Sequence, residues 1–159
     1  MHFAFSSTFP KNLCVLLLVG SLIGCHRAPK DAAELQRELP RIYVGELRLQ
    51  GQAEPVRLRV TPHNFSPRDA NVLEFNGVQY ALLDAHGSTL TEGDASIVGT
   101  ITLPGLEVRL ENIGNLANGE DLVKTGSFKG KLDGDLQSGE AEWATSLGQR
   151  GTLKVHAQK

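Results

Sequence analysis

Apolar and polar residues alternate with a period of two from residue 41 almost to the C-terminus. Arg57 and Arg59, for example, separate Val56, Leu58 and Val60. Such alternation predicts β-strands with one buried and one solvated face. The sequence therefore predicts an all-β fold, an antiparallel up-and-down meander of eight to nine strands that forms a small barrel or a partly open barrel.

Turn-forming residues divide the alternating pattern into strands. Asn76-Gly77 stands between two apolar runs and predicts a hairpin, because both residues accept positive φ. Pro104-Gly105 predicts a second tight turn. Short connections alternate along the chain with three long ones, Thr61–Ala70, Asp84–Asp94 and Asn112–Asp121.

The alternation of short and long connections has a geometric consequence. In a simple meander, the three long loops lie at one end of the barrel, and the first strand begins at that same end. The first and last of nine strands run parallel, so closure then requires one irregular strand or a partly open barrel.

Charges on the C-terminal strands indicate how these strands pair. Placing Phe128 opposite Trp143 gives two further pairs of opposite charge, Lys129 with Glu142 and Lys131 with Glu140. Placing Trp143 opposite Leu153 extends the ladder to the final strand. Such exposed pairs contribute only roughly 0.2–1 kcal/mol each. We therefore interpret the charges as a solvated exterior that specifies register.

The N-terminal segment has a different pattern. Lys11 precedes an apolar run, Leu13–Ile23, which is too short to span a bilayer as a helix. Leu22-Ile23-Gly24-Cys25 closes the run and resembles the lipobox of bacterial lipoprotein signal peptides. The alternative is an ordinary secretory signal in which a cysteine happens to follow the cleavage junction.

The resemblance to bacterial lipoproteins implies cleavage before Cys25 and a lipid on its thiol. His26, in place of Asp at the next position, implies the outer membrane, facing the periplasm. The predicted organisation is a signal peptide over residues 1–24, a lipidated tether over 25–40 and a barrel domain over 41–159. Ala32, Leu35 and Leu39 predict a short helix in the tether, which either links freely or covers the open end of the barrel.

Charge and cysteine content narrow the classes of partner. The formal net charge is −2, and it becomes −3 once the segment with Lys11 is removed, which does not suit a phosphate-binding surface. Nucleic acid is therefore not an expected partner. The two cysteines are Cys14, in the signal peptide, and Cys25, so no disulfide is expected within the domain.

The predicted long loops carry the candidate binding residues, which are His63, Phe65, Asp84, His86, Glu92, Asp94 and Asn115. The segment from Asp84 to Asp94 comes nearest to a metal site, but its spacing matches no ligand motif, so we expect neither metal nor cofactor. Phe65 is either an exposed anchor for a partner or a cap on the barrel end. The sequence contains none of the common hydrolase, zincin or phosphate-loop motifs, which predicts a non-enzymatic protein.

Two functional hypotheses follow. In the first, the protein is an interaction or scaffolding module that binds an envelope protein through its long-loop end. In the second, the barrel is a lipocalin-like carrier of a small apolar molecule or lipid. The interior residues predicted for such a carrier are Leu47, Leu58, Val60, Tyr80, Leu82, Ile101, Val108 and Leu110.

Overall fold

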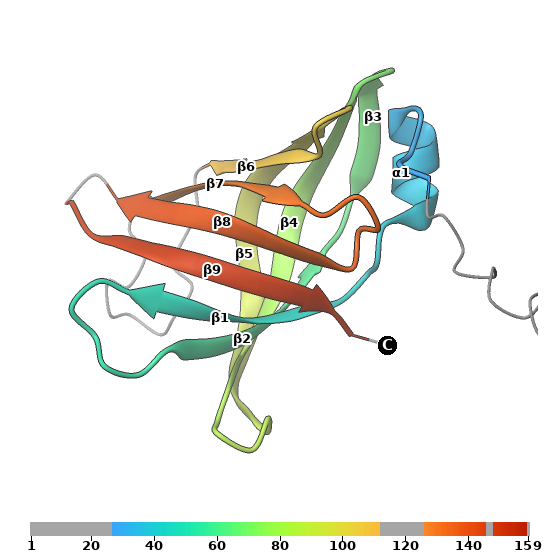
Figure 1. Cartoon of the computed structure of the whole chain (residues 1–159). Coiled ribbons are helices and arrows are strands. Elements are labelled where there is room, and N and C mark those ends of the chain that lie inside the picture. The colour runs from blue at the N-terminus through green and yellow to red at the C-terminus, as the bar shows by residue number, and fades with distance from the viewer. Residues whose placement is uncertain (1–26, 112–125, 146–147, 159) are drawn as a thin grey trace, which may run out of the picture.

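The computed structural model describes residues 27–111, 126–145 and 148–158. Cys25, Asn115 and the whole of the predicted loop Asn112–Asp121 lie outside the described residues. Within them the chain forms one helix and nine strands (Figure 1). The elements are α1 (Ala32–Glu38), β1 (Tyr43–Leu49), β2 (Val56–Pro62), β3 (Phe65–Asp69), β4 (Val72–Leu83), β5 (Thr89–Thr102), β6 (Glu107–Glu111), β7 (Gly126–Leu132), β8 (Ser138–Thr145) and β9 (Arg150–Ala157).

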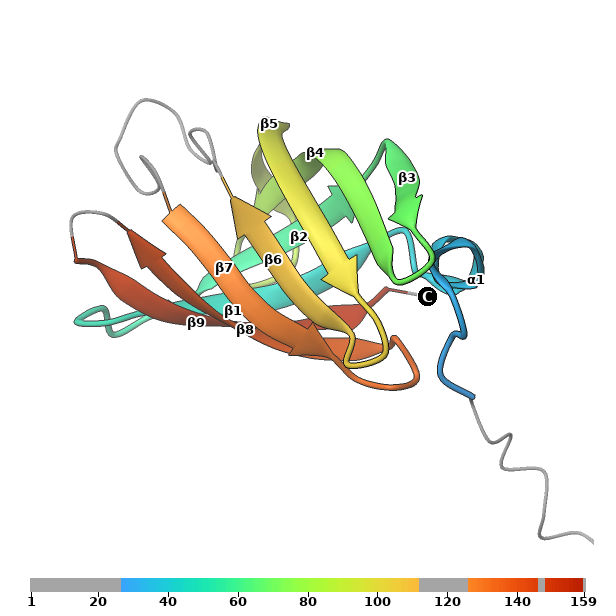
Figure 2. The same cartoon turned by 90° about the horizontal axis from the view of Figure 1, so that it is seen from above.

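The strands form a closed antiparallel barrel. The order within the sheet is β2-β1-β9-β8-β7-β6-β5-β4, and a further pairing of β2 with β4 closes the circuit (Figure 2). The ninth strand, β3, follows β2 along the same edge of β4. This arrangement confirms the predicted all-β antiparallel barrel preceded by a short helix.

The predicted hairpin at Asn76-Gly77 is wrong. Both residues lie inside β4, a single strand of 12 residues. The register with β5 shifts between Asn76 and Val78, and Gly77 has a φ of 98°. Asn-Gly therefore forms a β-bulge, because β5 pairs with β4 on both sides of the dipeptide and holds the strand extended. Joining the two predicted strands leaves eight in the circuit, so the first and last run antiparallel and the barrel closes.

Two of the predicted long loops are also wrong. Residues 61–70 contain the end of β2 and the whole of β3, and only residues 63–64 separate these strands. The predicted loop Asp84–Asp94 is a turn of residues 84–88, after which β5 begins. The predicted gathering of long loops at one end therefore does not hold for the two that the structure describes. Helix α1 lies beside β3, away from the connections 50–55 and 84–88 (Figure 1), so the tether does not start among the long connections as predicted.

The predicted pairing of β7 with β8 is confirmed, since Phe128 lies opposite Trp143. The pairing of β8 with β9 is wrong by two residues, because Trp143 lies opposite Gly151 and not Leu153. A shift of two residues keeps every side chain on its own face, so alternation does not distinguish the two registers.

The observed register places charges of alternating sign on the outside of six successive strands. From β6 through β7, β8, β9 and β1 to β2, these are Glu107, Lys131, Glu140, Lys154, Glu46 and Arg57. Lys154 Nζ lies 3.5 Å from Glu140 Oε1, and Arg57 Nε lies 3.5 Å from Glu46 Oε1. The side chains of both pairs are well exposed, so these contacts fix register more than they stabilise the barrel.

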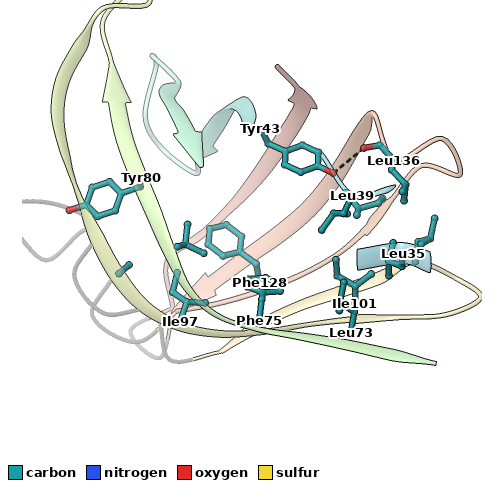
Figure 3. Packing of buried hydrophobic residues seen from close by; sticks show 14 of the residues in the cluster. Leu35, Leu39, Tyr43, Leu73, Phe75, Tyr80, Ile97, Ile101, Phe128 and Leu136 are labelled. Carbon is teal, nitrogen blue, oxygen red and sulfur yellow. Dashed lines mark hydrogen bonds between the residues drawn. The ribbon is translucent and has the colours of Figure 1, made fainter. Parts of the chain in front are cut away.

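Helix α1 covers one end of the barrel. Asp31 caps it by accepting a hydrogen bond from the backbone N–H of Glu34 at 2.8 Å. Ala32 and Leu35 are 0% exposed and Leu39 is 4% exposed. They pack into the same apolar cluster as residues of the turns at this end (Figure 3). The sequence left open whether the tether helix links freely or covers the barrel end, and the structure shows that it covers the end.

Candidate ligand cavity

The interior of the barrel contains a partly open cavity of about 160 Å³. All eight residues predicted for the interior line it, as their alternation required. Sequence reasoning missed other lining residues, among them Phe75, Ile97, Phe128 and Leu153. These residues occupy the inward-facing positions of their strands, so the same alternation would have predicted them had it been applied to every strand. Leu39 also lines the cavity but was assigned to the tether.

The cavity surface is apolar. In the part of the chain that the structure describes, no polar atom is exposed to it. The hydroxyl group of Tyr43 lies near its α1 end and donates a hydrogen bond to the backbone carbonyl of Leu136 at 3.0 Å (Figure 3). Burial raises the pKa of Tyr43 far above its usual value, and the carboxylate of Asp135 raises it further. Tyr43 is therefore neutral, and its hydroxyl proton is already used in the hydrogen bond to Leu136.

This environment predicts how Tyr43 contributes to stability at different pH values. A phenol whose pKa is raised by folding stabilises the protein below the unfolded-state pKa of about 10, and this contribution is lost as the pH rises above that value. We expect Tyr43→Phe to cost about 1 kcal/mol at neutral pH, because the Leu136 carbonyl loses its partner. The difference between the two proteins should shrink above pH 10 in urea unfolding. A difference that stays constant up to pH 11 would contradict this account.

Glycine shapes one wall of the cavity. Gly99 lies opposite Phe75, and a Cβ at residue 99 would overlap the Phe75 ring. The end of the Phe75 ring therefore occupies the space that a side chain at residue 99 would take.

Among the described residues, Trp143 has the largest of the fully buried side chains, at 1% exposure. Its ring lies 6.5 Å from that of Phe128, centroid to centroid, at an angle of 38°. Among the described residues, the indole Nε1 has no hydrogen-bond partner. A buried unpaired N–H group costs about 1–3 kcal/mol, so packing of the ring must outweigh this penalty.

Phe65 belongs to the apolar cluster and is not an exposed anchor. It is half-buried at the start of β3, with its ring 5.5 Å from that of Phe75. The guanidinium carbon of Arg41 lies 5.5 Å from the ring centroid of Phe65. His63 is half-buried next to the bulge, where its backbone N–H donates to the carbonyl of Gly77 at 3.1 Å. The cap interpretation of Phe65 is the one observed.

The remaining candidate residues that the structure describes form no common site. The Asp84 carboxylate accepts hydrogen bonds from the backbone N–H groups of His86 and Ser88, at 2.8 and 2.9 Å, so it serves the turn. Glu92 and Asp94 are exposed on β5. No group of three potential metal ligands occurs in the described ranges. None of the helices described there is long and apolar enough to cross a membrane.

Comparisons with known proteins extend the description of the fold only slightly. The sequence matches no protein-family model and no curated protein. Among solved structures, a de novo designed fluorescence-activating β-barrel matches with 15% identity and a TM-score of 0.44, covering 78% of this chain and 97% of that chain. A redesigned β-barrel matches with 17% identity and a TM-score of 0.46, covering 83% and 99% respectively. The barrel of this chain is established by its own strand pairings.

Proposed function

We propose that this chain is a lipid-anchored protein of the bacterial cell envelope that binds a small apolar ligand inside its barrel. The observation that carries the proposal is the cavity of about 160 Å³ whose exposed surface, among the described residues, is apolar. Cavities of this kind stay dry, and one of about 150 Å³ is large enough to bind benzene. Occupying the space removes apolar surface of both partners from water, at about 25 cal/mol per Å².

The size of the cavity limits the ligand. Sites for whole drug-sized molecules typically measure about 300–1,000 Å³. A cavity of about 160 Å³ suits a small ring or a short stretch of an alkyl chain. With no polar group facing the cavity in the described residues, the ligand is selected by shape and apolar character. The alkyl portion of a lipid or fatty acid fits this description.

The proposed location rests on the lipobox resemblance at Leu22-Ile23-Gly24-Cys25. A lipid on Cys25 would hold the barrel at the outer membrane, facing the periplasm. The interaction or scaffolding hypothesis has less support, because the residues predicted for a single loop-rich end lie at separate places on the barrel. No observation on the described residues favours it specifically.

Mass spectrometry under native conditions tests the binding proposal. The barrel would be exported with a non-lipoprotein signal, starting at His26, and purified without detergent, because detergent would compete for the cavity. We expect a bound species of discrete mass that is lost on denaturation. A protein of bare mass that also fails to bind added medium-chain fatty acids would refute ligand binding.

A further inference from the structure

The chain joins the barrel only a few residues after Cys25. Pro29 is already buried, and α1 begins at Ala32. The backbone N–H of Ala32 donates to the carbonyl of Ala70, in the turn between β3 and β4, at 2.9 Å. The position of the chain relative to the barrel is therefore fixed from about Pro29 onward.

Helix α1 is held on the barrel by several independent contacts. Ala32 and Leu35 are fully buried against the apolar cluster. The side-chain amide of Gln36 donates to the carbonyl of Phe65 at 3.2 Å. Freeing the helix to lengthen the tether would expose these side chains and break these bonds.

The reach of the remaining tether is short. Pro29 is the fourth residue after Cys25, and four residue steps of a fully extended chain span at most about 14 Å. A lipid on Cys25 must then hold the α1 end of the barrel within that distance of the bilayer surface. The strands lead away from this end, and β1, with seven residues, is about 23 Å long. The connection 50–55 follows at its far end (Figure 1).

We infer that the anchored barrel stands on its α1 end, with this end against the lipid surface and the connection 50–55 directed away from it. The inference rests on the proposed lipidation of Cys25. Exposed charges of both signs occur on α1 and just before it, including Lys30, Asp31, Arg37 and Glu38. The lipid and the short tether, and not attraction between the helix and anionic headgroups, set the orientation, so added salt should not change it.

Fluorescence quenching on vesicles tests the orientation. The only cysteines are Cys14, which leaves with the signal peptide, and Cys25, whose thiol carries the lipid, so one introduced cysteine can be labelled selectively. The full-length protein would be processed in cells, purified and reconstituted into phosphatidylcholine vesicles with a short-range quencher on the headgroups. Labels would be placed at Glu38→Cys, on α1, and at Gln52→Cys, in the connection 50–55, both exposed positions.

We expect the label at residue 38 to be quenched several-fold more than the label at residue 52. Inserting ten glycine and serine residues between Ala28 and Pro29 should remove most of this difference. Equal quenching at the two positions in vesicle-bound protein, or stronger quenching at residue 52, would overturn the orientation.

The test separates the orientation from the proposals on which it depends. If the Cys25→Ser variant, produced in the same cells, incorporates labelled fatty acid as well as the unchanged protein does, the anchor on Cys25 is disproved and the orientation with it. Ligand binding is measured in the absence of vesicles, so its failure would leave the quenching result intact.

Discussion

Replacing Trp143 with alanine is expected to lower the free energy of unfolding by about 3–5 kcal/mol. The indole ring is 1% exposed and packs against Phe128, so its removal leaves an apolar void next to the existing cavity. Small domains are stable by about 5–15 kcal/mol, so a loss of this size is a large part of the total. Unfolding in urea should be followed by circular dichroism, since Trp143 is the only tryptophan.

The Trp143→Phe variant separates the ring from its N–H group. Phenylalanine keeps much of the apolar contact and removes the N–H that has no partner among the described residues. We therefore expect a clearly smaller loss than for alanine. Equal losses in the two variants would show that the N–H group has a partner that contributes to stability.

Replacing Ala141 with leucine is expected to abolish ligand binding while raising the stability of the empty barrel. Ala141 lines the cavity, and its neighbours in register are Gly130 on β7 and Leu153 on β9. The leucine side chain adds three carbon atoms, which would occupy the space proposed for the ligand. Filling a cavity in this way commonly stabilises a protein by about 0.5–2 kcal/mol.

Native mass spectrometry and urea unfolding check both parts of this expectation. Ala144, on the same strand, is exposed, so Ala144→Leu is a matched control that should leave binding unchanged. If Ala141→Leu retained the bound species at full occupancy, the ligand would not be in the barrel interior. If it lowered stability by more than about 1 kcal/mol, the interior would be packed too tightly to admit a ligand.

The barrel was predictable from sequence because inward and outward residues alternate on nearly every strand. The identity of the interior residues follows from the same period, and all eight named in advance line the cavity. The tether helix was predictable from the spacing of Ala32, Leu35 and Leu39, each of which is buried. The sequence did not decide whether the helix links freely or packs on the barrel end, because this packing depends on residues such as Leu73 that are distant in sequence.

The errors arose where local sequence has two structural solutions. The dipeptide Asn76-Gly77 is compatible with a hairpin turn or with a β-bulge, and only the partner strand β5 decides between them. Registers that differ by two residues place the same side chains on the same face, so the alternation does not distinguish Gly151 from Leu153 as the partner of Trp143. Both decisions depend on contacts between segments that a local pattern does not contain.

The candidate loop residues that the structure describes do not lie together, for a related reason. Their grouping assumed that every stretch of weak alternation was a loop at the same end of the barrel. Glu92 and Asp94 instead lie on β5, and Phe65 begins β3. The carboxylate of Asp84 accepts hydrogen bonds from backbone N–H groups of the turn 84–88.

The first and last strands of the barrel are neighbours. Tyr43 at the start of β1 lies opposite Ala157 at the end of β9, and the backbone N–H of Gln158 donates to the carbonyl of Ile42 at 3.0 Å. Hydrogen bonds thus connect all strands of the barrel in a ring, although the polypeptide chain itself is open between β9 and β1. A circular permutant that joins the old ends by a linker and opens the chain within 50–55 keeps every strand pairing. In such a permutant the barrel would be tethered from the far end, and its direction relative to the bilayer would be inverted.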